Sequence, residues 1–301
     1  LIRKAYKFKV KILNMYRPPY VAGSFYPKDK STLQKMIGKF MEEAKRNIDF
    51  IDEGKYAGVL CPHAGYVFSG KTQAYSYSYL SDSPPETFVI LGPNHTGLGL
   101  PVSLMDKGSW ETPFGEIKIN EELASKIVEK SGFIGVDSSA HKYEHSIEVQ
   151  LPFLQYIKED ATFVPICMGI QDKETALDIG KAIAKSSKES VGVIASSDLV
   201  HYGSRFGYNP LKGNKEDTLS WIKNNDMEIL KMAENFDIDG LYKFIDTKRY
   251  TTCGYGPLSV MLSSMGELGA KKARILDYSN SYETSGDWSA VVGYGSVGIR
   301  C

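Results

Sequence analysis

The chain of 301 residues has few cysteines, Cys61, Cys167, Cys253 and Cys301, and no CxxC pair. This scarcity argues against a disulfide scaffold and a structural zinc knuckle, and unpaired thiols favour a reducing, cytoplasmic location. Long apolar runs are also missing: none approaches the roughly 18 residues that span a bilayer. The 36 basic and 36 acidic residues cancel. We therefore expect neither nucleic acid nor a membrane as a partner.

The first eleven residues, LIRKAYKFKVK, are locally basic but lack the continuous apolar segment of a signal peptide. We expect residues 1–19 to form an exposed arm and residues 20–301 to form one α/β domain. No repeat and no low-complexity linker divides the remainder, which favours a single domain.

Short runs rich in β-branched residues alternate with segments of helical periodicity. The predicted strands are 56–60, 88–91, 162–168, 191–195, 274–278 and 289–299, and SWETPFGEIKI (109–119) indicates a hairpin. Helices are predicted after caps at Ser31 (with Gln34 as a capping box), Asn120 and Asp172, and over 217–234 and 257–268. This order predicts a mixed, mostly parallel central sheet covered by helices on both faces.

Three of the five histidines directly follow predicted strands. His63 ends YAGVLCPH, His95 ends FVILGPNH, and VGVIASSDLVH supplies Asp198 and His201. If these strands are parallel neighbours, their carboxyl-end loops converge and bring the three imidazoles and the carboxylate into one cleft. An ordinary loop role remains the alternative for each histidine taken singly.

The segment HKYEHSIEVQLPFLQ contains His141, Glu144, His145 and Glu148 and is predicted to open a helix. Residues four apart share a helical face, so the two histidines have a spacing that is compatible with metal binding. The zincin pattern HExxH is absent. A capped helix start, with glutamates near the positive end of the helix dipole, is an equally good interpretation.

Cys253 lies in RYTTCGYGPLS, just before the predicted helix at Pro257. A cysteine near a helix N-terminus can have a lowered pKa and ligate metal as a thiolate. The alternative is an inert, small apolar side chain. The other three cysteines are interpreted as structural or terminal thiols.

Seven motifs occur along the chain in the order VAGSFYP, PHAGYVFSG, ILGPNHTG, TPFGE, EHSIEVQLPFL, SSDLVHYG and TTCGYGP. In this order they resemble the Memo family, which in archaea and bacteria is also labelled AmmeMemoRadiSam system protein B. The resemblance runs from about Tyr20 to about Gly298. The family is related to class III extradiol dioxygenases, which use non-haem Fe(II), so the resemblance implies a similar fold with a cleft at one end.

The resemblance also implies that His63, His95 and Cys253 ligate one metal ion and that Asp198, His145 and His201 line the same cleft. We expect His201 and His145 to support the site or transfer protons, and Asp198 to orient one of them. The related dioxygenases have a carboxylate where this chain has Cys253, which disfavours ordinary ring cleavage.

These residues lead to the hypothesis of a mononuclear metal site for redox or oxygen chemistry on an unknown small molecule or peptide. Fe(II) is favoured by the resemblance, and Cu or Zn is possible because a thiolate suits softer metals. If the protein is an enzyme, we expect a non-haem, metal-dependent oxidoreductase. In prokaryotes the family is associated with a radical-SAM protein and an AMMECR-like protein, which are expected pathway partners.

Two other classes of function remain open. A metal-free module could reuse the cleft to bind a peptide or protein, with Tyr66, Tyr202 and Tyr255 as anchors. A zinc hydrolase is the second class, since histidine and cysteine suit catalytic zinc. A serine hydrolase built on Ser197 is disfavoured because the GxSxG elbow is absent.

Overall fold

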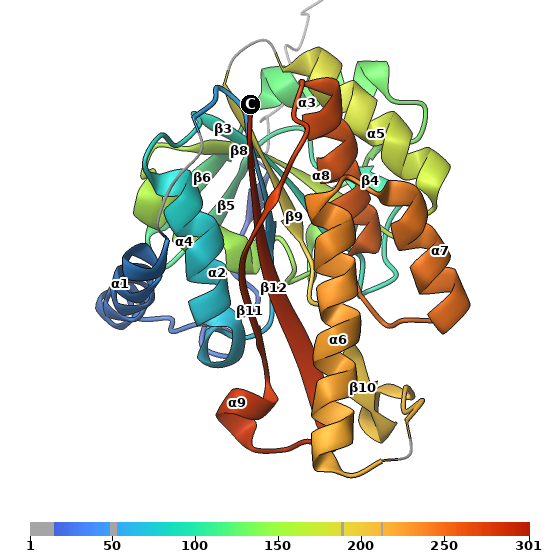
Figure 1. Cartoon of the computed structure of the whole chain (residues 1–301). Coiled ribbons are helices and arrows are strands. Elements are labelled where there is room, and N and C mark those ends of the chain that lie inside the picture. The colour runs from blue at the N-terminus through green and yellow to red at the C-terminus, as the bar shows by residue number, and fades with distance from the viewer. Residues whose placement is uncertain (1–14, 49–52, 188–189, 212) are drawn as a thin grey trace, which may run out of the picture.

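Parallel strands form the centre of one mixed sheet (Figure 1). The structure, a computed structural model, describes residues 15–48, 53–187, 190–211 and 213–301. In spatial order the central parallel strands are β6 (Gly115–Ile119), β8 (Thr162–Met168), β3 (Thr87–Pro93), β9 (Val191–Ser196) and β2 (Ala57–Cys61). Their carboxyl ends therefore meet at one edge of the sheet.

Antiparallel and short strands complete both margins of the sheet. On one side β12 (Ala290–Arg300) pairs antiparallel with β2, and it also pairs with β10 (His201–Gly203) and β11 (Arg274–Asn280). On the other side are β5 (Ser109–Thr112), β1 (Tyr16–Arg17), β4 (Val102–Leu104) and β7 (Gly135–Val136).

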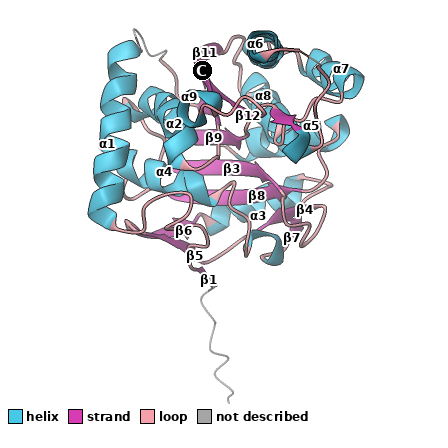
Figure 2. Ribbon diagram, turned by 90° about the horizontal axis from the view of Figure 1, so that it is seen from below, coloured by secondary structure: helices cyan, strands magenta, loops and turns pink. Residues whose placement is uncertain are grey.

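Helices cover both faces of the sheet (Figure 2). One face carries α1 (Lys30–Asn47), α2 (Tyr66–Ser81) and α4 (Leu151–Ile157). The other carries α3 (Glu121–Lys130), α5 (Lys173–Ser186) and α8 (Tyr255–Glu267). The remaining helices are α6 (Lys215–Glu234), α7 (Ile238–Lys248) and α9 (Tyr282–Ser285), with 3₁₀ turns η1 (Ser139–His141), η2 (Glu148–Gln150) and η3 (Ser204–Phe206). Among the described residues, no helix is both long and apolar enough to cross a bilayer.

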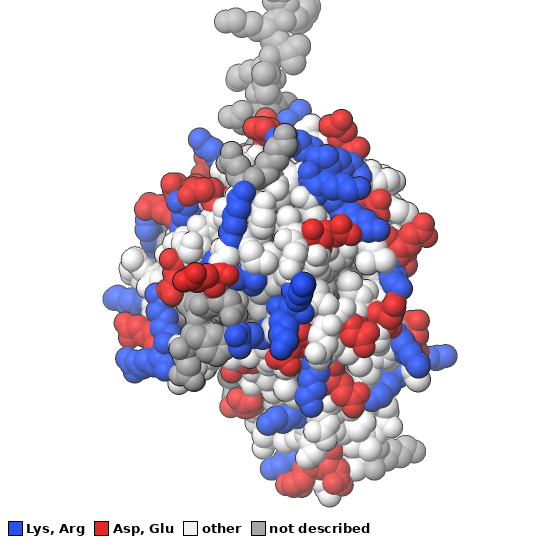
Figure 3. Space-filling view, turned by 45° about the horizontal axis from the view of Figure 1, so that its top comes forward, with Lys and Arg blue, Asp and Glu red and all other residues white. Residues whose placement is uncertain are grey.

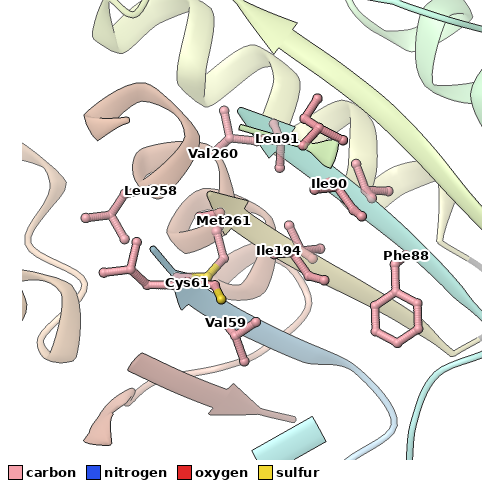
Figure 4. Close-up of a cluster of buried hydrophobic side chains, with 14 of the residues drawn as sticks. Val59, Cys61, Phe88, Ile90, Leu91, Ile194, Leu258, Val260 and Met261 are labelled. Carbon is pink, nitrogen blue, oxygen red and sulfur yellow. The ribbon is translucent and has the colours of Figure 1, made fainter. Parts of the chain in front are cut away.

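The core lies between the sheet and its helices. Figure 4 shows side chains of β2, β3 and β9 meeting those of α8, with Phe88, Ile194 and Met261 among them. All three are completely buried. Because the central strands are covered on both faces, their sequences are continuously apolar rather than alternating.

The predicted architecture is confirmed: one mixed, mostly parallel sheet lies between helical layers. Each predicted strand is present, and the hairpin is formed by β5 and β6. The caps at Asn120 and Asp172 accept hydrogen bonds from the first turns of α3 and α5.

Two local predictions were wrong. Helix α1 is capped by Asp29, not Ser31, because the Asp29 carboxylate accepts the backbone N–H of Thr32. The stretch from His141 to Glu148 is not the start of an α-helix: His141 ends η1, Glu148 begins η2, and residues 142–147 form the loop between them. Of the predicted arm, residues 1–14 lie outside the described residues, while Tyr16–Arg17 pair with β5 as β1.

Candidate functional site

A cavity of about 460 Å³ opens where the loops after β2, β3 and β9 meet. These strands are neighbours in the order β3-β9-β2, so the segments that follow them converge. The cavity is lined by residues that include His63, His95, His145, Asp198 and His201. Five of the six predicted site residues therefore line one space, and the sixth, Cys253, contacts His63 directly.

Three imidazoles form the centre of the cavity. One ligand atom from each of His63, His95 and His145 lies within 4.8 Å of the other two. The ring centroids of His95 and His145 are 4.6 Å apart, and that of His63 lies 5.2 Å and 5.5 Å from them. No other group of three or more possible ligands this close is found among the described residues.

The His63 ring is oriented by a chain of hydrogen bonds. The Ser196 hydroxyl donates its single proton to the carbonyl oxygen of Ser146 at 2.7 Å. It must therefore accept the proton of His63 Nδ1, which lies 3.0 Å away. This tautomer leaves the lone pair on His63 Nε2, which lies 3.3 Å from Cys253 Sγ. Burial, followed by the charges of neighbouring imidazoles, holds the pKa of His63 well below its usual value.

Glu144 supports the other two histidines. Its carboxylate lies 2.9 Å from His95 Nδ1 and 3.5 Å from His145 Nδ1. It also accepts the backbone N–H groups of His95, His145 and Ser146. Burial opposes its ionisation, but the hydrogen bond from His95 and the nearby imidazoles lower the pKa of Glu144 to about 2. An ionised Glu144 accepts a hydrogen bond from His95 Nδ1–H, so in the neutral imidazole Nε2 carries the lone pair.

The histidines differ in their affinity for protons. Burial opposes protonation of His95, but the hydrogen bond and the charge of Glu144 raise the pKa of that imidazole. Burial lowers the pKa of His145 to about 4. His145 is therefore neutral near pH 7, which is the state that a metal ligand requires.

Cys253 contacts the Nε2 side of His63 and lies at the N-terminus of α8. Its Sγ is 3.3 Å from His63 Nε2 and 3.3 Å from the backbone nitrogen of Asp198, which donates to it. The expected lowering of the thiol pKa is not found: burial, followed by the charge of Asp198, raises the pKa of Cys253. A bound cation could reverse this shift, since metals bind cysteine as the thiolate.

Asp198 and His201 also line the cavity. Asp198 is buried and accepts the backbone N–H groups of His63 at 2.7 Å and Ala64 at 3.3 Å, which fixes the turn that presents His63. His201 Nδ1 is 3.2 Å from the carbonyl oxygens of Leu199 and Thr251. Nδ1 is therefore the donor, and Nε2 of His201 is the acceptor.

Some residues singled out in the sequence lie elsewhere. His141 is buried against Trp110, with ring centroids 5.6 Å apart, and does not line the cavity. Tyr66 and Tyr202 are buried, so they cannot act as exposed anchors for a peptide. Conversely, sequence reasoning gave no role to Phe25, whose ring lies 4.7 Å from that of His145. The only signal for Phe25 was its place in the VAGSFYP motif.

The arrangement suits a mononuclear metal ion. His63 and His95 each have Nδ1 bonded to a protein oxygen and Nε2 directed away from it, the usual state of metal-bound histidine. Imidazole nitrogens suit zinc, copper and iron.

Comparison with known proteins agrees with this fold and these motifs. The family model described as Memo-like protein matches residues 17–298. A MEMO1 family protein of Pyrococcus furiosus is 43% identical over 298 residues, which cover 95% of this chain and 99% of that protein. A MEMO1 family protein of Thermococcus kodakarensis is 44% identical over 294 residues, covering 95% and 100%. The chain belongs to the Memo-like family.

A solved structure also shares the fold. The crystal structure of an uncharacterized protein from Escherichia coli superposes with a TM-score of 0.52 at 15% sequence identity. The match covers 81% of this chain and 99% of that chain.

Proposed function

We propose that the cavity binds one iron or copper ion and supports redox or oxygen chemistry on a small molecule or peptide. The observation that carries this proposal is the cluster of three histidines whose ligand atoms lie within 4.8 Å of one another. When bound, such an ion would supply electron transfer and open coordination positions.

His63 and His95 are the two ligands common to every set we consider, because Nδ1 of each is bonded to a protein oxygen and Nε2 is left as the possible ligand atom. The resemblance assigns Cys253 as the third ligand, and its Sγ faces His63 Nε2 at 3.3 Å. His145 is the competing donor, since it belongs to the three-histidine cluster. We propose the set with Cys253, and variants of the two residues distinguish the alternatives.

Other residues of the cavity have supporting roles. His201 lines the cavity, and imidazole is the side chain that most often serves as a general acid or base, so His201 is the proposed proton-transfer group. Asp198 holds the His63 turn through two backbone N–H groups. Phe25 lines the cavity beside His145 and supplies an apolar wall there.

The first test is the metal content of protein purified anaerobically without a histidine tag. We expect one iron or copper ion per chain in the parent and loss of that ion in His63→Ala. His201→Asn is the matched control, because it removes a cavity histidine outside the cluster and should retain the metal. Zinc in place of iron or copper would favour a hydrolase. A parent that takes up no metal after reconstitution would contradict the proposal and favour a binding module.

The third ligand is tested with Co²⁺ as a spectroscopic probe. Bound Co²⁺ should give a thiolate charge-transfer absorption in the parent and in His145→Asn, but not in Cys253→Ser. If the absorption is absent from the parent, and His145→Asn rather than Cys253→Ser loses affinity for Co²⁺, the ligand set is the three histidines.

A further inference from the structure

Arg17 is a buried arginine on the short edge strand β1, and it does not line the cavity. Its guanidinium makes three contacts with one loop: Nε donates to the carbonyl oxygen of His141 at 2.6 Å, Nη2 donates to that of Glu144 at 2.7 Å, and Nη1 is 2.7 Å from Glu148 Oε2. The fork geometry of arginine therefore binds both ends and the middle of the segment 141–148.

The contacts of Arg17 are themselves held in place. Its Cζ lies 4.1 Å from the ring centroid of the completely buried Trp110. Glu148, also buried, accepts the backbone N–H groups of Tyr20 and Val21 and the hydroxyl of Tyr26. Neither end of the Arg17–Glu148 pair can move without breaking several hydrogen bonds.

The segment that Arg17 holds carries Glu144 and His145. Residues 142–147 lie between the 3₁₀ turns η1 and η2 and are not helical, and the Arg17 contact to the Glu144 carbonyl is one of the hydrogen bonds that hold them. The Glu144 carboxylate then contacts both His95 and His145. A continuous series of contacts therefore joins β1 to two of the three clustered imidazoles.

We propose that Glu144 and Arg17 are positioning residues for the metal: Glu144 sets the tautomer of His95 and the placement of His95 and His145, and Arg17 holds the backbone of Glu144. The inference rests on the proposed metal-binding function. Carboxylates that orient metal-bound histidines typically contribute 10–100-fold to metal affinity. Lysine cannot replace Arg17, since a single ammonium cannot reproduce the three-way fork.

The test compares Co²⁺ affinity by chelator competition in the parent, Glu144→Gln and Arg17→Lys, at a temperature where circular dichroism shows each protein folded. Glu144→Gln keeps the shape of the side chain but loses the negative charge that accepts the hydrogen bond from His95. We expect the affinity for Co²⁺ to fall roughly 10–100-fold. Arg17→Lys should weaken binding in the same direction. Both variants should also change the visible Co²⁺ spectrum, because the imidazoles lose their fixed orientation.

Arg300→Lys is the matched control. Arg300 is also a buried arginine whose guanidinium donates to backbone carbonyls, those of Tyr79, Leu80 and Ser83, but it lies on β12 away from the cavity. The Arg300→Lys variant should have a lower free energy of unfolding than the parent but an unchanged Co²⁺ affinity.

The outcomes separate this inference from the function on which it rests. Parent-like affinity and spectrum in Glu144→Gln overturn the positioning role and leave the metal site standing, even if Arg17→Lys does not fold. An equal loss of Co²⁺ affinity in Arg300→Lys also overturns the positioning role. The loss in Arg17→Lys would then be explained by lowered stability of the protein alone. A parent that binds neither Co²⁺ nor Zn²⁺ overturns the proposed function together with this inference.

Discussion

At the scale of single residues, the most informative group outside the cavity is Asp226 on α6. It is completely buried and accepts the hydroxyls of Tyr250 at 2.9 Å and Tyr278 at 3.0 Å and the backbone N–H of Val200 at 3.1 Å. A Cβ at Gly293 would lie 1.9 Å from its carboxylate, so only glycine leaves room there. Despite these three donors, burial raises the pKa of Asp226 to about 7.

This shift predicts how stability depends on pH. Between pH 4 and 7 the folded protein retains a proton on Asp226 that the unfolded chain releases. The stabilisation is complete below the usual carboxyl pKa of 3.8 and is lost as the pH rises through about 7. Asp226→Asn should remove this dependence on pH. Between pH 4 and 7 the free energy of unfolding of the parent should therefore fall by up to about 4 kcal/mol relative to that of the variant.

Urea unfolding at several pH values measures this difference. The exposed Asp246 on α7 offers a control, since Asp246→Asn should leave the slope of the parent unchanged. Parallel pH profiles for the parent and Asp226→Asn would show that Asp226 is ionised in the folded protein.

At the scale of elements, α2 and α1 illustrate what local pattern can and cannot predict. Helix α2 has no apolar stripe. It is buried on almost all sides, and many of its buried side chains are serine, threonine and tyrosine rather than aliphatic. Their hydroxyls find partners in the sheet: Ser76 donates to the carbonyl oxygen of Leu60, and Thr72 to Asp277. No helical periodicity signals such a helix. Helix α1, by contrast, is amphipathic, and only its cap was misplaced.

The cap of α1 gives a prediction at this scale. Asp29→Ala should lower the free energy of unfolding by about 1 kcal/mol, because the first turn loses the acceptor for the Thr32 N–H. Ser31→Ala should change it by less than about 0.5 kcal/mol, since Ser31 is exposed and does not accept from the first turn. Urea unfolding measures both; a larger effect for Ser31→Ala would restore the cap expected from the sequence.

At the scale of the whole molecule, the candidate site and the core are separate. The cavity lies at the edge of the sheet, whereas the core fills the space between sheet and helices (Figure 4). On the face shown in Figure 3, basic and acidic side chains are interspersed, in keeping with the formal net charge of +0. Neither the core nor the surface charge depends on the proposed ion.

Removal of the metal should therefore leave the fold intact. We expect the chelated protein to keep the circular dichroism of the loaded protein and to unfold at a lower temperature. An ion present at about 1,000 times its dissociation constant adds about 4 kcal/mol by mass action, whatever the size of the core. Thermal unfolding with and without chelator measures the shift. Loss of secondary structure on chelation would show that the metal is required for folding.

Much of the fold and part of the site could be predicted from local pattern. The strands were visible as β-branched runs, and the loops after β2, β3 and β9 already contained His63, His95 and Asp198. Their convergence followed from the rule that parallel neighbours end at one edge. The helical spacing of His141 and His145 misled, because Arg17, 124 residues from His141 and 127 from Glu144, holds that segment in another shape.

The sequence by itself determined which chemical groups this protein can use, the order of its main strands and amphipathic helices, and its membership in the Memo-like family. These properties depend on periodicity, caps and motifs, which act over a few residues. Only the tertiary structure decided that Glu144 supports His95, that Ser196 sets the tautomer of His63, and that Cys253 lies against His63. Those contacts join residues 49 to 190 positions apart, and no local pattern encodes a distance of that kind.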